Sequence, residues 1–269
     1  ISDRGAFTKA FHDKLFDVIF IPLPLKGEEK KCLKAFENAI TENDIAAFIY
    51  EPLILGAGGM LMYEPEILNT LIQKAKEKNI ICIADEVMTG FYRSGIMFAS
   101  EYCEISPDIM CLSKGLTGGT MALGVTACAQ FIYNAFYAED KMKTFYHGHS
   151  YTANPLACTA ALASLDLVEK GSFIDSINVI QTQHTDFTAK LLQYPRFENI
   201  RQRGTIIAFD VKTKTQTSYF NSERDSLYNY FLEKGILLRP LGNTLYIMPP
   251  YCISEEQLNY VYTSILDYN

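Results

Sequence analysis

An acid and a lysine stand at the ends of two apolar segments near the middle of the chain. Asp85 closes the run IICIAD (residues 80–85), and Lys114 closes the run DIMCLSK (residues 108–114). A partly desolvated lysine is a nucleophile that forms a Schiff base with an aldehyde. An acid can keep a pyridine nitrogen protonated, and pyridoxal phosphate is a cofactor that uses both groups. The pair therefore suggests a pyridoxal-phosphate site.

Each of the two residues alone has a plainer explanation. A lysine at a strand end is often exposed to water, and an acid there often caps the following turn. Glycines at positions 115, 118 and 119 nevertheless leave room beside Lys114 for a planar group. The choice between the two explanations depends on the elements around the pair.

Those elements predict an α/β fold with a largely parallel sheet. Besides the two runs above, residues 45–52 (IAAFIYEP) and 124–129 (GVTACA) are short apolar segments typical of buried strands. Residues 28–40 have apolar side chains at helical spacing, and Pro65 opens a second helix through about residue 79. A long loop with a helix is expected between residues 85 and 108. In such sheets ligands bind at the carboxyl ends of the strands.

The second part of the chain predicts a small α+β domain. Long helices are expected over residues 153–171 and 172–192, a strand over 204–211, a helix near 225–234, and a hairpin over 236–251 that turns at Gly242-Asn243. Ser254 is expected to cap a final helix. We therefore predict a cofactor-binding large domain over residues 1–170 and a C-terminal small domain over 171–269.

Composition excludes several classes of function. The formal net charge of −7 and the lack of a basic cluster argue against nucleic-acid binding, and no apolar run is long enough for a membrane span. The seven cysteines are scattered singly, which indicates reduced, mostly buried thiols and a cytoplasmic protein. His147 and His149 have no third ligand nearby in the sequence, so no metal site is expected.

The segments ADEVMTGFYRSG and PDIMCLSKGLTGG resemble the core signature of class-III aminotransferases, which are pyridoxal-phosphate enzymes of fold type I. FIYEP, LGAGGM, NPLACTAALA and LRPLGNTLYIMPPY extend the resemblance over nearly the whole chain. The resemblance implies a homodimer with shared active sites.

The resemblance also assigns the cofactor contacts. Lys114 would hold the aldehyde of pyridoxal phosphate and act as the catalytic residue that moves a proton, and Asp85 would pair with the pyridine nitrogen. Val87 would press on one face of the ring, although a plain core valine is an equal alternative. Ser150, with the backbone of His149, would reach the cofactor phosphate of the neighbouring subunit. Glu51 stands where the family keeps an acid near the cofactor.

On the substrate side, Arg239 matches an arginine that binds a substrate carboxylate, and Tyr246, Gly148 and Arg93 match residues near the substrate. TGGTM, HGHSYTANPLAC and RPLGNTLYIMPPY resemble the branch of the family that acts in biotin synthesis. That branch transfers the amino group of S-adenosylmethionine to 8-amino-7-oxononanoate. The alternatives are an ω-aminotransferase of the ornithine or aminobutyrate type, and an inactive fragment that serves only dimerisation.

In the family, a further N-terminal part supplies a Gly-Ser phosphate loop and an aromatic residue stacked on the pyridine ring. Neither has a counterpart in residues 1–20. The expectation is therefore that the 269-residue chain is a C-terminal fragment or the ordered remainder of a longer chain, and that by itself it binds the cofactor weakly with little or no turnover.

Overall fold

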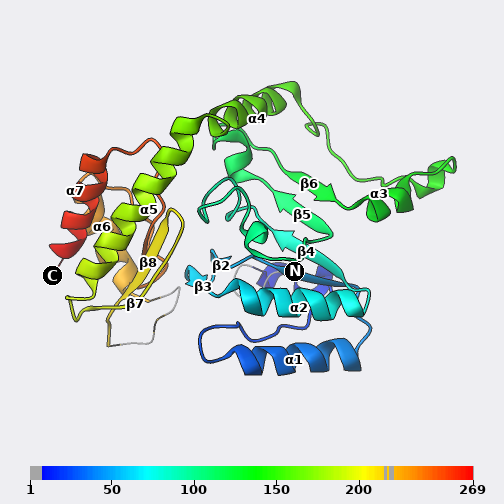
Figure 1. The fold of residues 1–269 in the computed structure, drawn as a ribbon, viewed down its shortest axis with the longest axis horizontal. Helices are drawn as coiled ribbons and strands as arrows, with labels where there is room; N and C mark the ends of the chain where they lie inside the picture. The colour runs from blue at the N-terminus through cyan, green and yellow to red at the C-terminus, as the bar shows by residue number, and fades with distance from the viewer. Residues whose placement is uncertain (1–7, 215–216, 218–220, 269) are drawn as a thin grey trace.

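A four-stranded sheet forms the centre of the N-terminal part of the molecule (Figure 1). The computed structural model describes residues 8–214, 217 and 221–268. Strands β1 (Ala47–Tyr50), β4 (Ile81–Asp85) and β5 (Ile109–Leu112) are parallel neighbours, and β6 (Val125–Cys128) pairs antiparallel with β5. The predicted α/β fold with a largely parallel sheet is confirmed, with one antiparallel strand at its edge.

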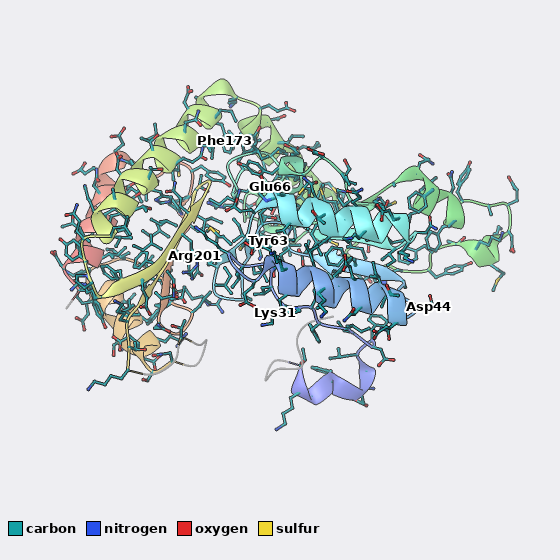
Figure 2. All side chains as sticks on the ribbon, turned by 60° about the horizontal axis from the view of Figure 1, so that its bottom comes forward. Lys31, Asp44, Tyr63, Glu66, Phe173 and Arg201 are labelled. Carbon is teal, nitrogen blue, oxygen red and sulfur yellow. The ribbon has the colours of Figure 1, made fainter. Side chains whose placement is uncertain are left out.

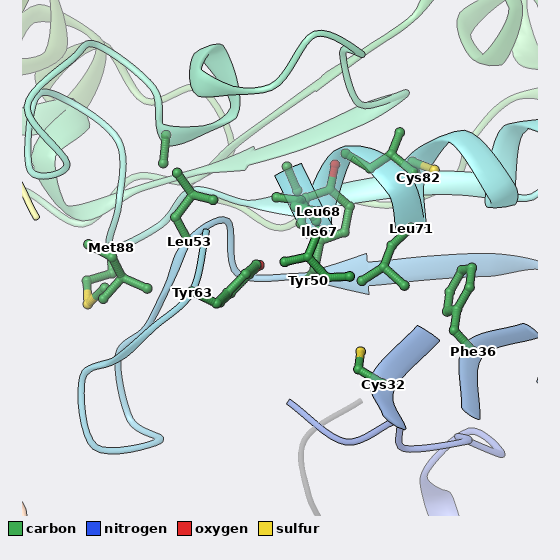
Figure 3. Close-up of a cluster of buried hydrophobic side chains, with 14 of the residues drawn as sticks. Cys32, Phe36, Tyr50, Leu53, Tyr63, Ile67, Leu68, Leu71, Cys82 and Met88 are labelled. Carbon is green, nitrogen blue, oxygen red and sulfur yellow. The ribbon is translucent and has the colours of Figure 1, made fainter. Parts of the chain in front are cut away.

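Two helices cover one face of this sheet. They are α1 (Glu29–Glu42) and α2 (Pro65–Glu77), which lie side by side below the strands in Figure 1. Their apolar stripes enter a buried cluster with the strand residues, in which Phe36, Leu68, Leu71 and Cys82 are at most 3% exposed (Figure 3). A short hairpin of β2 (Ile54–Leu55) and β3 (Leu61–Met62) follows β1 and carries the 56–60 loop.

The segment between β4 and β5 differs from the prediction. It contains only a short 3-10 helix, η2 (Ala99–Tyr102), where a longer helix was expected. We call residues 86–100 the 86–100 loop. Phe91 and Tyr92 have φ values of 58° and 70°, in the left-handed region that a regular α-helix does not use. Two successive residues of this kind prevent a continuous helix.

A projecting arm connects β6 to the second part of the chain. It contains α3 (Gln130–Phe136) and the 3-10 helix η4 (Lys141–Lys143), and it extends away from the sheet in Figure 1. Helix α4 (Pro155–Val168), capped by Asn154, returns the chain, and α5 (Gly171–Leu191) follows directly. Aromatic side chains on the arm are more than half exposed: Phe131, Tyr133, Tyr137, Phe145, Tyr146 and Tyr151.

The second part contains an antiparallel sheet in the order β7-β8-β9. Its strands are β7 (Phe197–Arg203), β8 (Ile206–Val211) and β9 (Thr244–Ile247), and its helices are α5, α6 (Glu223–Glu233) and α7 (Glu255–Leu266). Every residue of β8 is buried. Ile206 and Ala208 join the core of the N-terminal part, whereas Ile207 and Phe209 join a second core with the helices. Alternate side chains of one strand therefore connect both cores.

Three sequence predictions need correction here. Strand β7 was not predicted, because FENIRQR is polar and lies at the sheet edge. The predicted hairpin over residues 236–251 is reduced to a two-residue turn at Gly242-Asn243, closed by a bridge between Leu241 and Thr244, and only the second arm is a strand. Of the seven free cysteines, only Cys32 and Cys82 are buried, so most are not.

Other predictions about the C-terminal part are confirmed. Ser254 caps α7 and forms a capping box with Gln257. The Ser254 hydroxyl accepts the Gln257 N–H, and the Gln257 side-chain oxygen accepts the Ser254 N–H. No helix among the described residues is long and apolar enough to cross a membrane. The division into two domains at residue 170 stays a prediction.

Candidate active site

Three charged side chains meet at the carboxyl edge of the parallel strands. Tyr50 is paired in register with Ala84, so Glu51 and Asp85 leave neighbouring strands at the same level. Asp85 in turn lies opposite Cys111 on β5, and Lys114 follows that strand. The fold thus brings together the two residues from which the pyridoxal-phosphate prediction started, and it adds Glu51 to them.

The charges of this group act on one another. Burial raises the pKa of the Glu51 carboxyl, the negative charge of Asp85 raises it further, and the Gly56 N–H and Lys114 lower it. Glu51 Oε2 accepts the Gly56 N–H at 2.9 Å, which fixes the acid against the 56–60 loop. The edge therefore holds two carboxyls beside one ammonium group.

Lys114 begins the 3-10 helix η3 (Lys114–Thr117) and has a φ of 42°, an uncommon value for a lysine. The residue is exposed, so the expectation of a partly desolvated amine is wrong for the described chain. The reason lies in its surroundings. A side chain at Gly119 would meet nothing within 4 Å, and one at Gly118 would meet only Ser164. The space beside Lys114 is therefore open.

The next residue, Gly115, is in close contact with the 86–100 loop. A Cβ atom there would lie 2.9 Å from the Phe91 ring, so only glycine fits without displacing that ring. The tip of the 86–100 loop therefore supports the turn that carries Lys114.

Asp85 and Val87 are both half-buried, and they lie where β4 passes into a turn. The Val87 N–H donates to Asp85 Oδ1 at 3.1 Å. Glu86, between them, is fully buried. Sequence reasoning missed Glu86; the one signal was an acid in the middle of an otherwise apolar segment.

Arg93 makes contacts within the protein. Its Nη1 donates to the Pro249 carbonyl at 2.6 Å, and its guanidinium lies 4.3 Å from the centre of the Tyr251 ring. Burial lowers its pKa. Its backbone oxygen accepts the Thr205 N–H at 3.1 Å. Arg93 thus joins the 86–100 loop to the C-terminal part, and a contact with substrate stays a prediction.

Arg239 is exposed, and Tyr246 is half-buried on β9. Tyr246 lies opposite Ala208, on the face of the sheet that packs against the N-terminal core. That is the side on which the carboxyl edge lies, whereas the Arg239 guanidinium is available to solvent.

The remaining predicted residues, Gly148, His149 and Ser150, lie on the projecting arm and are all exposed. The hydrogen bonds of His149 are local: its N–H donates to Thr152 Oγ1, and its Nδ1 accepts the Tyr151 N–H. Within one copy of the chain the arm extends away from the carboxyl edge (Figure 1).

The donor set at the edge fits a planar, aldehyde-bearing cofactor. An accessible amine stands beside open space, and the Asp85 carboxylate is held in one orientation next to it. An amine and an acid in this arrangement can form a covalent bond to an aldehyde and stabilise a protonated ring nitrogen. Among the described residues, no cluster of three or more His, Cys, Asp or Glu side chains could hold a metal ion.

Comparisons with known proteins agree with this chemistry. A protein from Synechococcus elongatus named adenosylmethionine-8-amino-7-oxononanoate aminotransferase is 39% identical over 99% of this chain and 64% of its own length. The protein of the same name from Helicobacter pylori is 38% identical over 96% of this chain and 60% of its own length. The chain therefore spans a little less than two thirds of these relatives.

Solved structures show the same fold. The crystal structure of adenosylmethionine-8-amino-7-oxononanoate aminotransferase from Methanocaldococcus jannaschii has a TM-score of 0.87 at 32% identity, covering 98% of this chain and 63% of that one. An amine transaminase from an uncultivated Pseudomonas species, solved in its PLP-bound form, has a TM-score of 0.81 at 29% identity, covering 90% of this chain and 56% of that one.

The profile of the family described as aminotransferase class-III matches residues 2–268, which is nearly every position. The resemblance predicted from the sequence is confirmed, and with it the fold class. The chain belongs to the class-III aminotransferase family.

Proposed function

We propose that the protein is a pyridoxal-phosphate-dependent aminotransferase of biotin synthesis. It would transfer the amino group of S-adenosylmethionine to 8-amino-7-oxononanoate and release 7,8-diaminononanoate. The observation that carries the proposal is the meeting of Asp85, Lys114 and Glu51 at one sheet edge, in a chain whose relatives are named for this reaction.

Lys114 and Asp85 would hold the cofactor. Bound pyridoxal phosphate supplies an aldehyde that accepts an amino group and a ring that withdraws electrons. Lys114 Nζ would bind that aldehyde, and as a free amine it would move a proton at the substrate carbon. The Asp85 carboxylate would keep the ring nitrogen protonated, and Val87 would contact the ring.

Arg239, Tyr246, Gly148 and Arg93 would define the substrate side. The exposed guanidinium of Arg239 is free to form a bidentate pair with the carboxylate of the oxo acid. Tyr246, on the face of β9 toward the N-terminal core, would line the same pocket. Arg93 would act from the 86–100 loop, with its guanidinium held by Pro249 and Tyr251.

The protein would act as a homodimer in the cytoplasm. The exposed aromatic side chains of the projecting arm form a surface that favours a protein contact. In a dimer the arm would bring His149 and Ser150 to the cofactor phosphate of the neighbouring subunit. Residues 1–170 would form the cofactor-binding domain and residues 171–269 the small domain.

The test is a comparison of amino donors with the whole encoded protein, because the chain spans 60–64% of its named relatives. The purified protein is loaded with pyridoxal phosphate and mixed with S-adenosylmethionine, ornithine or aminobutyrate, and the cofactor absorbance is followed. A response to S-adenosylmethionine alone supports the proposal. A response to ornithine or aminobutyrate without one to S-adenosylmethionine refutes it.

A matched pair of variants tests the acceptor side. Arg239→Met is expected to raise the KM for 8-amino-7-oxononanoate at least about tenfold, since a charge-assisted pair contributes about 1.5–3 kcal/mol. Arg224→Met is the control, because the Arg224 side chain is 42% exposed and, among the described residues, forms an ion pair with its neighbour Asp225. An unchanged KM in Arg239→Met would show that Arg239 does not bind the carboxylate of 8-amino-7-oxononanoate.

A further inference from the structure

Glu86 is a fully buried carboxylate next to the proposed cofactor acid, and none of the chemistry above uses it. We propose that Glu86 is a positioning residue that fixes the main chain between Asp85 and Val87, so that both side chains face the cofactor. This inference rests on the proposed function, because it concerns how the acid of that site is held.

Four neutral donors surround the Glu86 carboxylate. Oε2 accepts from Thr89 Oγ1 at 2.5 Å and from the Ala99 N–H at 3.1 Å. Oε1 accepts from the N–H and the hydroxyl of Ser100 at 2.7 and 2.6 Å. These donors belong to the two ends of the 86–100 loop, so the carboxylate closes the loop upon itself. A charged acceptor makes such bonds stronger than a neutral one would.

The backbone of Glu86 is held as firmly as its side chain. Its N–H donates to the Cys111 carbonyl at 3.0 Å, which extends the ladder between β4 and β5 by one residue. Its carbonyl accepts the Gly90 N–H at 3.0 Å. A side chain at Gly90 would lie 2.9 Å from that carbonyl, so this turn also requires glycine. Both backbone polar groups and both carboxylate oxygens are therefore fixed.

This arrangement determines where Asp85 points. Asp85 is the last residue of β4, and the chain enters a turn directly after Glu86, whose side chain is fully buried. Asp85 and Val87 flank this fixed residue, and both are half-buried. The hydrogen bond from the Val87 N–H to Asp85 Oδ1 depends on the same stretch of main chain. Rotation of residue 86 would move both the acid and the valine.

A carboxylate suits this position better than an amide. Glutamine has one acceptor oxygen, and its NH₂ group would face either the Ala99 N–H or the donors of Ser100. A backbone N–H cannot turn to accept a hydrogen bond, so at least one donor would lose its partner. Glu86→Gln therefore loosens the start of the 86–100 loop with little change in volume.

The experiment uses the whole encoded protein in four forms besides the wild type: Glu86→Gln, Asp85→Asn, the double variant, and Asp108→Asn. Asp108 is the control because it is another buried carboxylate of the same sheet. It accepts the Cys82 N–H at 2.8 Å and pairs with Lys76, but it lies at the opposite end of β5. The measurements are the Kd of pyridoxal phosphate, the pH dependence of the bound cofactor's absorbance, and the Tm without cofactor.

Glu86→Gln is expected to weaken pyridoxal-phosphate binding about tenfold, which corresponds to about one lost bond to a charged group. It should also lower the pH at which the bound ring loses its proton, as Asp85→Asn does. In the Asp85→Asn background, Glu86→Gln should weaken pyridoxal-phosphate binding by less than about a further twofold, because both changes act on one interaction. Asp108→Asn should lower the Tm and leave both cofactor readouts unchanged.

Four outcomes decide between the ideas. Additive effects of Glu86→Gln and Asp85→Asn, or an unchanged pH dependence in Glu86→Gln, overturn the positioning role. If the wild type fails to bind pyridoxal phosphate at all, the proposed function itself fails. If Glu86→Gln does not fold, Thr89→Val is used instead, because it removes a single donor. It should shift the pH dependence of the cofactor's absorbance in the same direction by a smaller amount. No shift in that pH dependence would overturn the positioning role of Glu86.

Discussion

Gly204 lies where the C-terminal sheet meets the 86–100 loop, and we expect Gly204→Ala to be strongly destabilising. A Cβ atom at this position would lie 2.1 Å from the Ser94 carbonyl carbon, 2.2 Å from the Gly95 nitrogen and 2.6 Å from the Arg93 oxygen. All three are backbone atoms, so no side chain can rotate to make room. Carbon atoms in contact are normally about 3.5–4.0 Å apart. The two segments must therefore separate by more than about 1 Å.

Two effects add to the cost of this change. Gly204 has a φ of 55°, and an alanine in the left-handed region costs about 1–2 kcal/mol. Overpacking of a close contact costs about 1–3 kcal/mol, and more where backbone must move. The sum is about 2–5 kcal/mol. Gly235 isolates the first effect, because its φ is 70° and a Cβ atom there would meet nothing within 4 Å. Gly235→Ala should therefore cost only about 1–2 kcal/mol.

The assay is urea denaturation of the whole encoded protein, followed by far-ultraviolet circular dichroism. This signal does not depend on tryptophan, which the chain lacks. Gly204→Ala should shift the midpoint to lower urea by clearly more than Gly235→Ala does. Equal midpoints for the two variants would show that the contact between Gly204 and the 86–100 loop is not formed, and the reasoning would fail.

Three further predictions concern other parts of the molecule. Lys114→Ala should abolish the cofactor label that borohydride reduction leaves on the protein, whereas Lys141→Ala on the projecting arm should keep it; mass mapping of the labelled peptide checks this. His184 is fully buried, donates from Nε2 to the Thr205 carbonyl and accepts at Nδ1 from Tyr262, and burial lowers its pKa from 6.5 to about 4. Between pH 6.5 and 4 the unfolded chain then binds a proton at this histidine that the folded chain does not. Up to about 3 kcal/mol of stability is therefore lost as the pH falls from 6.5 to 4. His184→Gln should flatten this pH dependence of stability, measured by urea titrations at each pH. Arg201→Met should cost about 3 kcal/mol in the urea assay because it leaves the buried Asp210 carboxylate without its cation, whereas breaking the exposed Arg224–Asp225 pair should cost less than about 1 kcal/mol.

The sequence was most informative where one local pattern dominates the structure. The apolar runs before Asp85 and Lys114 predict β4 and β5, since strands buried on both faces are continuously apolar. Ser254 predicts the start of α7, because capping depends on neighbouring residues only. The meeting of Asp85 and Lys114 followed from one rule about the carboxyl ends of parallel strands.

Features that depend on distant contacts were not predictable from local patterns. Strand β7 is polar, and it becomes a strand by pairing with β8. Its Arg201, labelled in Figure 2, bonds to Asp210 and to the carbonyls of Gly59 and Met60. The exposure of Lys114 depends on which elements cover it, and a lysine followed by glycines carries no such information. Glu86 was missed because two of its partner residues, Ala99 and Ser100, lie 13 and 14 residues farther along the chain.

The 86–100 loop connects the stability of the C-terminal part to the geometry of the proposed site. On its outer side the loop is held by Thr205, which bonds to the Arg93 carbonyl, and by Tyr251, whose hydroxyl donates to the Phe91 carbonyl at 2.6 Å. On its inner side the Phe91 ring lies against Gly115, directly after Lys114. If Gly204→Ala shifts the 86–100 loop, the Phe91 ring would therefore move and displace the turn that carries Lys114.

Loss of stability and loss of cofactor binding should accordingly occur together in Gly204→Ala. Gly235 lies at the end of α6 and makes no such contact, so Gly235→Ala should lower stability without affecting the Kd of pyridoxal phosphate. The C-terminal sheet would then influence the carboxyl edge. Through backbone contacts with the 86–100 loop, it supports the turn that carries Lys114 at the proposed cofactor site.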